Sequence, residues 1–350
     1  MILPSRIATV GVGILAVGAL ALSLTACSSG STAAGGSGSS AKTTIKFALD
    51  WTPNTDHTGL FVAEEKGWFA KAGINVDILP YSDSSTDTLI HSGAAQFGIS
   101  FEDQALSAAA AGTTTTSVMS VLQHDVTRIG VLKSATDITS PKDLDGKLYG
   151  QAGASGPFTT MVEDAIKQDG GTGKFTTVNL GTSAYQALYK KKVDFTGAFV
   201  TWEGIQAKLN GTPMKYFNLS DYGLPDEYSV IIEGNNTWLK QNPAEAKKFV
   251  SILQRGYTYA ANHPDAAAKI LIDENPGVFG NTKLVYESQR LISKDYLKDA
   301  NGEVGTQTSA MWQGLADYYT KHGFLTDKNG KTVTKTVDTS KLFSTAYISK

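Results

Sequence analysis

The sequence is poor in residues that form covalent or metal cross-links. It contains a single cysteine, Cys27, so no disulfide can form within the chain. None of the five histidines belongs to a His-Glu-x-x-His sequence, which argues against a zinc site. No Gly-x-Ser-x-Gly sequence is present, which weakens a hydrolase interpretation. We therefore expect no metal, no cofactor and no catalytic residues, and a fold that its hydrophobic core stabilises.

The sequence also lacks an excess of charge of either sign. Its 31 basic and 33 acidic residues leave no positive field to attract a nucleic acid, which we exclude as a partner. Only 10 prolines and a hydrophobic content of 41% are typical of a globular chain rather than a disordered one. Residues 27–350 are numerous enough for one large or two medium domains with proper cores.

Residues 1–26 have the pattern of a lipoprotein signal peptide. Arg6 precedes an apolar run that ends in Leu-Thr-Ala directly before Cys27. This order predicts cleavage before Cys27 and its acylation, which would anchor the protein to the extracytoplasmic face of the cell membrane. The Gly/Ser-rich residues 27–42 would form a flexible tether. The alternative is an uncleaved membrane-spanning anchor, since roughly 20 apolar residues can cross a bilayer.

From residue 43 onward, β-rich runs alternate with helical patterns, which predicts an α/β protein with largely parallel sheets. Strands are expected at residues 44–49, 75–79, 96–100, 116–122, 128–132, 147–151, 176–180, 194–199 and 213–217. Helices are expected at residues 59–71, 87–92, 103–111, 157–168, 184–190 and 202–209, with a mostly helical region after residue 235.

Two α/β units in series followed by helices indicate two lobes. Residues 43–125 together with 234–350 would form lobe 1, and residues 126–233 would form lobe 2. The chain would cross between them twice, near residues 123–127 and 228–235, and such a pair of crossings works as a hinge. We expect the protein to be a monomer.

Several segments resemble one protein family. LDWTPNTDHTGL from Leu49, FGISFEDQA from Phe97, VLQHD from Val121 and VDFTGAFVTWEG from Val193 are similar to the NMT1/THI5-like group, which binds pyrimidine precursors of thiamine. Yeast hydroxymethylpyrimidine phosphate synthase belongs to the same superfamily. The resemblance implies a type II periplasmic-binding-protein fold that binds a small heterocyclic ligand between its lobes and delivers it to an ABC permease.

In such a fold the ligand lies at the carboxyl ends of the strands. The loop that follows the first strand contains Asp50, Trp51, Asn54 and His57. Trp51 offers a flat face to an aromatic ring, and Asn54 has both a donor and an acceptor for ring nitrogens. The alternatives are a packing tryptophan, a turn asparagine and a histidine that orders its own loop.

Glu203 would face Asp50 from the opposite lobe, and a carboxylate can accept paired hydrogen bonds from an aminopyrimidine. Phe199 and Trp202 could form a second aromatic wall. All three could instead be ordinary packing or helix-start residues.

Four further candidates depend more strongly on the expected fold. Gly153 and Ser155 precede the helix at 157–168 and could present N–H groups to the ligand, or form a tight turn. Glu102 could line the same cleft or favour a helix start, and Tyr228 could contact the ring or pack at the hinge.

The functional alternatives differ in the cargo or in the class of protein. Riboflavin, another flat heterocycle or a small sulfonate could replace the pyrimidine, since stacking does not discriminate between flat rings. An enzyme like the yeast synthase is a remote alternative, because that enzyme has a cysteine-rich segment and this chain has a single cysteine. An adhesion protein of the cell surface would need no closed cleft.

Overall fold

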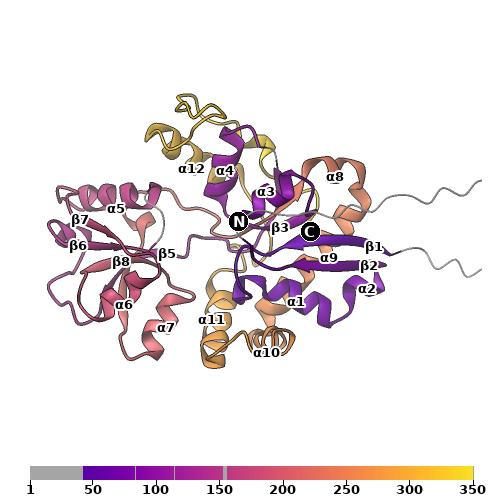
Figure 1. Cartoon of the computed structure of the whole chain (residues 1–350), viewed down its shortest axis with the longest axis horizontal. Helices are drawn as coiled ribbons and strands as arrows, with labels where there is room; N and C mark the ends of the chain where they lie inside the picture. The colour runs from indigo at the N-terminus through magenta and orange to yellow at the C-terminus, as the bar shows by residue number, and fades with distance from the viewer. Residues whose placement is uncertain (1–41, 83, 114, 153–155, 350) are drawn as a thin grey trace, which may run out of the picture. The chain divides into compact units, whose positions relative to one another are not determined.

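The computed structural model describes residues 42–82, 84–113, 115–152 and 156–349 (Figure 1). The predicted signal peptide, Cys27, Gly153 and Ser155 lie outside the described residues. No helix in the described part of the chain has both the length and the apolar character needed to cross a membrane.

The chain forms two five-stranded sheets. The first consists of β1 (Thr43–Ala48), β2 (Ile74–Leu79), β3 (Phe97–Ser100), β4 (Thr115–Ser120) and β10 (Ile231–Asn235), in the order β2-β1-β3-β10-β4. The second consists of β5 (Thr127–Leu132), β6 (Leu148–Gln151), β7 (Thr176–Asn179), β8 (Phe195–Phe199) and β9 (Met214–Phe217), in the order β7-β6-β8-β5-β9.

Each sheet contains one strand that arrives from the other sheet, at the same place in the strand order. β10 pairs antiparallel with β3 and β4, and β5 pairs antiparallel with β8 and β9. The sheets are therefore mixed, and the prediction of largely parallel sheets was wrong at these pairings. A helical crossover produces parallel neighbours within one sheet, whereas a strand that comes from another sheet is free of that constraint. Residues 231–233, which we expected at the end of lobe 2, belong to β10 and pair with β3 of the first sheet.

Helices cover both faces of the sheets. Around the second sheet, α5 (Pro157–Gln168) lies on one side and α6 (Ser183–Tyr189) and α7 (Glu203–Leu209) lie on the other (Figure 1). The α5 bounds equal the predicted ones. The other helices are α1 (Thr58–Glu65), α2 (Trp68–Lys71), α3 (Thr86–His91), α4 (Glu102–Ala110), α8 (Asn236–Gln241), α9 (Pro243–Asn262), α10 (Pro264–Glu274), α11 (Thr282–Asp295) and α12 (Ser309–Lys321).

The predicted helix at residues 59–71 is interrupted. Gly67 has φ +63° between α1 and α2, a left-handed conformation that glycine adopts without steric cost. The chain therefore turns at Gly67, and Trp68 starts a second, short helix.

Helix α9 is central to the core of the first sheet. Phe249, Leu253 and Tyr257, which we expected on one stripe, are all fully buried. The Phe249 ring stacks on Phe69 and Phe97, with ring centroids 5.1 Å and 4.6 Å away. This stripe connects α9 to α2 and to the sheet, and it places Tyr257 beneath the loop after β1.

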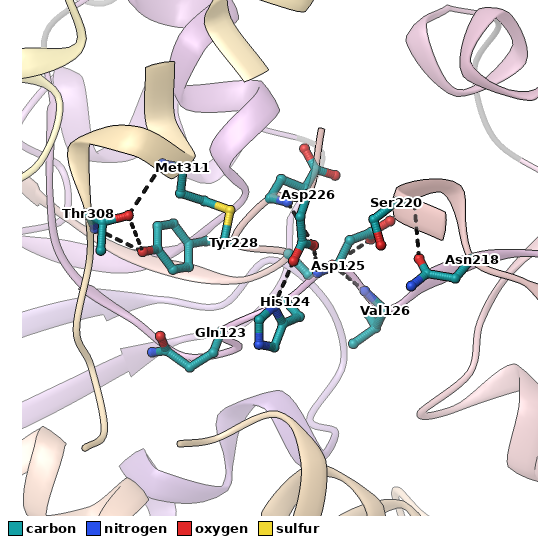
Figure 2. Close-up of polar contacts among 12 residues, drawn as sticks. Gln123, His124, Asp125, Val126, Asn218, Ser220, Asp226, Tyr228, Thr308 and Met311 are labelled. Atoms are coloured by element: carbon teal, nitrogen blue, oxygen red, sulfur yellow. Dashed lines mark hydrogen bonds and ion pairs between the residues drawn. The ribbon is translucent and has the colours of Figure 1, made fainter. Parts of the chain in front are cut away.

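The chain passes between the sheets twice, outward at residues 121–126 and back at residues 218–230. These outgoing and returning passages lie side by side and are joined by polar contacts (Figure 2). The Asp125 N–H donates to Asp226 Oδ1 at 2.9 Å, and His124 Nδ1 lies 2.6 Å from Asp226 Oδ2. The Val126 N–H donates to Ser229 Oγ at 3.0 Å. These bonds hold the outgoing and returning passages together. Neither passage contains an α-helix or a β-strand.

Candidate functional site

A cavity of about 550 Å³ is formed where loops from both sheets meet. Its walls follow the carboxyl ends of β1, β2, β3 and β8, the position expected for a ligand in an open α/β sheet. The lining residues are Asp50, Trp51, Thr52, Asn54, Thr55, Asp56, Tyr81, Ser82, Ser84, Ser85, Thr86, Phe101, Gln104, Phe199, Thr201, Trp202 and Glu203.

The structure brings six of the predicted site residues to this cavity: Asp50, Trp51, Asn54, Phe199, Trp202 and Glu203. The first three come from the first sheet and the last three from the second. Side chains from the two predicted lobes therefore share one cavity.

His57 lies behind the cavity and orients Asp50. It is fully buried, and its Nδ1 accepts the Asn54 N–H at 3.2 Å. A backbone N–H can only donate, so the proton of the neutral imidazole is on Nε2, which lies 2.7 Å from Asp50 Oδ1. His57 therefore donates to Asp50 and fixes the direction of its carboxyl group, and it does not line the cavity.

Asn54 has a local role as well as a place in the cavity wall. It caps the short 3-10 helix η1 (Thr55–His57), and its Oδ1 accepts the Asp56 N–H at 2.8 Å. This capping explains why the loop after β1 turns sharply and brings Asp50, Trp51 and Asp56 to one cavity.

Two aromatic side chains stand at the cavity with half of their surface open to solvent. Trp51 is 50% exposed and Tyr81 is 46% exposed, and their ring centroids are 4.9 Å apart. Sequence reasoning missed Tyr81. The signal was present, because Tyr81 follows β2 as Trp51 follows β1, and parallel neighbours end at the same edge of a sheet.

Two carboxyl groups in the cavity have unusual proton affinities. Burial raises the pKa of Glu203 to about 7. Burial likewise raises the pKa of Asp56 to about 7, opposed by His57 and reinforced by the charges of Asp50 and Glu203. Asp56 was also missed by sequence reasoning, although it lies within the predicted loop.

The cavity is acidic and aromatic. It has the carboxyl groups of Asp50, Asp56 and Glu203, while no lysine, arginine or histidine is found among the lining residues that the structure describes. Its aromatic rings are those of Trp51, Tyr81, Phe101, Phe199 and Trp202. This composition suits a flat ligand that donates N–H groups or carries positive charge, and it is unfavourable for an anion.

Glu102 and Tyr228 do not line the cavity. Glu102 Oε2 accepts the Tyr228 N–H at 2.7 Å, and burial raises the pKa of Glu102 to about 8. Tyr228 Oη accepts the Thr308 N–H at 2.8 Å (Figure 2). These two residues attach the returning passage to α4 and α12.

The backbone conformation of Phe101 explains why Glu102 does not line the cavity. Phe101 is extended, with φ −128° and ψ 149°, so adjacent side chains point in opposite directions. Phe101 therefore faces the cavity and Glu102 faces the protein interior.

Comparisons with known proteins give a consistent result. The family model described as "NMT1/THI5 like" matches residues 54–267. The chain is 27% identical over 288 residues to the formylaminopyrimidine-binding protein of Halalkalibacterium halodurans, a match that covers 81% of this chain and 86% of the relative. It is also 27% identical over 255 residues to the 4-amino-5-hydroxymethyl-2-methylpyrimidine phosphate synthase THI11 of Saccharomyces cerevisiae, covering 69% and 74% of the two chains.

Solved structures confirm the fold. The ligand-binding component of an ABC-type import system from Staphylococcus aureus matches with a TM-score of 0.64 at 13% identity, covering 87% of this chain and 98% of the other. The predicted periplasmic-binding-protein fold is therefore confirmed, with two mixed five-stranded sheets.

Proposed function

The chain belongs to the NMT1/THI5-like family, and from this premise we propose that it is the substrate-binding protein of an ABC-type importer and binds a pyrimidine precursor of thiamine. One observation carries the choice of cargo. The cavity combines three carboxyl groups with five aromatic rings, and none of its described lining residues is basic. The similarity to a formylaminopyrimidine-binding protein over most of both chains supports the same cargo.

The chemistry of an aminopyrimidine fits these side chains. Its ring stacks on an aromatic face such as Trp51, and its exocyclic amino group and protonated ring nitrogen donate to one carboxylate. Glu203 and Asp50 are the proposed acceptors. A sulfonate is disfavoured as cargo, because three carboxyl groups would face its negative charge.

Ligand capture would close two lobes over the ring. We propose that lobe 1 comprises residues 43–125 and 231–350 and that lobe 2 comprises residues 126–230. This division puts β10 in lobe 1, with the other strands of its sheet. The short segments around Asp125 and Asp226 would bend as the hinge. A permease that binds the closed arrangement more tightly would then receive the loaded protein.

Titration of the purified protein with 4-amino-5-hydroxymethyl-2-methylpyrimidine and with its formylamino relative tests the cargo. We expect one molecule to bind per chain, with quenching of tryptophan fluorescence because Trp51 and Trp202 line the cavity. Trp312 is fully buried and lies outside the cavity lining, so its emission should not change and the quenching of the total fluorescence should be partial. If neither compound produces heat, quenching or a thermal shift, the pyrimidine assignment fails.

Membrane attachment is tested through the lone cysteine. We expect Cys27→Ser to release the protein from the membrane fraction and to abolish incorporation of labelled fatty acid, because the acyl chains have no other thiol to attach to. Ser29→Ala is the matched control and should stay in the membrane fraction. Retention of an unlabelled Cys27→Ser protein in the membrane would instead support an uncleaved apolar anchor.

The relatives named as pyrimidine phosphate synthases make an enzyme the second candidate. The described residues contain no cluster of histidine, cysteine, aspartate or glutamate suited to a metal ion. Such a synthase forms the pyrimidine phosphate as its product. Formation of 4-amino-5-hydroxymethyl-2-methylpyrimidine phosphate during incubation of the protein with pyridoxal phosphate would favour catalysis, and its absence from a protein that binds the pyrimidine would favour transport.

A further inference from the structure

Asp56 has a fixed backbone in the floor of the cavity. Its N–H donates to Asn54 Oδ1 at 2.8 Å, and its carbonyl oxygen accepts the O–H of Tyr257 at 2.7 Å. Tyr257 is fully buried in α9, so this contact ties the loop after β1 to the core. Both polar backbone groups of Asp56 are thus hydrogen-bonded, which fixes the point from which its side chain enters the cavity.

The same carboxyl has an unmet hydrogen-bonding need. Asp56 Oδ1 is buried and has no hydrogen-bond partner among the described residues, although Asp56 lines the cavity. Buried carboxyl oxygens in folded proteins are almost always paired, because leaving one unpaired forfeits its hydration. A ligand in the cavity is the natural source of the missing donor.

The groups around Asp56 are mostly acidic or neutral. Asp50 and His57 come from the same loop, Glu203 comes from α7, and Tyr257 comes from α9. His57 is committed to donating to Asp50 through Nε2. Three carboxyl groups thus share one cavity with no described cation among its lining residues, and repulsion disfavours ionising all of them at once.

We propose that Asp56 is a specificity-determining residue, and that in the absence of ligand Asp56 or Glu203 carries a proton, which a bound aminopyrimidine accepts on a ring nitrogen. This inference rests on the proposed function. The O–H bond of the carboxyl breaks, an N–H bond forms on the ring, and no other bond changes. The product is a positively charged ring paired with carboxylates, so a flat ring without a basic nitrogen gains nothing from Asp56.

The raised pKa of Asp56 and Glu203, both about 7, sets the pH window. Above this range the empty cavity has lost its proton, and the neutral ring must take one from solvent to form the same complex. The affinity for 4-amino-5-hydroxymethyl-2-methylpyrimidine should therefore fall as pH rises from 7 to 9, approaching tenfold per pH unit.

Calorimetric titration of the whole protein with this compound between pH 7 and pH 9 is the test. For the unaltered protein at pH 8.5, buffers of different ionisation enthalpy should show uptake of close to one proton per ligand. Asp56→Asn should bind about tenfold more weakly at pH 7, and its fall in affinity should begin at a lower pH than in the unaltered protein, because Glu203 then has no second acidic group beside it to repel. Glu233→Gln is the matched control, because Glu233 is also buried with a raised pKa but lies outside the cavity lining; its profile should follow the unaltered protein.

The two hypotheses fail in different ways. Absence of binding to the unaltered protein at every pH overturns the proposed function, and this inference with it. Binding with no proton uptake at pH 8.5, or an Asp56→Asn protein with unchanged affinity and pH profile, overturns this inference alone. The proton count on the unaltered protein keeps the test valid even if Asp56→Asn does not fold.

Discussion

Replacing Glu203 by glutamine is expected to weaken binding of 4-amino-5-hydroxymethyl-2-methylpyrimidine by about 100-fold at pH 7, equivalent to about 2.7 kcal/mol. Glutamine keeps the size of the side chain, but it removes the charge and places an NH₂ group where the ligand itself donates. Calorimetry measures the loss. Glu245→Gln is the control, because Glu245 also lies in the first turn of a helix and is outside the cavity lining.

Thermal unfolding of the same variant separates lost binding from lost structure. The folded-state pKa of Glu203 is raised to about 7 from an ordinary value of 4.5, so its contribution to stability is present at pH 4 and is lost as pH rises through 7. The ligand-free Glu203→Gln protein should therefore melt at a higher temperature than the unaltered protein at pH 8 and at a similar temperature at pH 4. An affinity within threefold of the unaltered protein would show that Glu203 does not bind the ligand.

The largest effect on folding is expected at Gly256 in α9. A Cβ atom there would lie 2.0 Å from the carbonyl oxygen of Gly59, because α1 and α9 pack with their backbones in contact. We expect Gly256→Ala to lower the free energy of unfolding by about 3 kcal/mol or more. It should also weaken ligand binding, since the next residue, Tyr257, holds the Asp56 carbonyl.

Gly314→Ala is the matched control for this change. Gly314 also lies inside a helix, α12, but a Cβ there would meet only Pro225 at 4.0 Å. We expect a gain of about 0.5–1 kcal/mol, because alanine loses less conformational entropy than glycine. Denaturant unfolding measures both variants, and a Gly256→Ala protein as stable as the unaltered one would contradict the close packing of α1 on α9.

The sequence predicts the cavity well where one short segment contains its own signals. The loop from Asp50 to His57 follows a clear strand pattern, and its unusual side chains indicate a site before any distance is known. Helix α5 is predicted at its exact bounds because Pro157 starts it and its apolar spacing is regular.

The sequence does not predict contacts that depend on distant segments. Asp56 is placed in the cavity floor by Tyr257, which is 201 residues further along the chain. The antiparallel insertion of β5 and β10 depends on which sheet each strand joins, and periodicity within a strand carries no information about that. Glu102 follows β3, which predicts a place in the cleft. Successive side chains of an extended segment point to opposite sides, however, so Phe101 faces the cavity and Glu102 faces the protein interior.

The most direct test of the whole account is a crystal structure of the protein with 4-amino-5-hydroxymethyl-2-methylpyrimidine. We expect the ring in the cavity beside Trp51, with its amino group and one ring nitrogen within hydrogen-bond distance of Glu203 and of Asp50 or Asp56. A ring bound outside this cavity, or one whose amino edge points away from Asp50, Asp56 and Glu203, would contradict it.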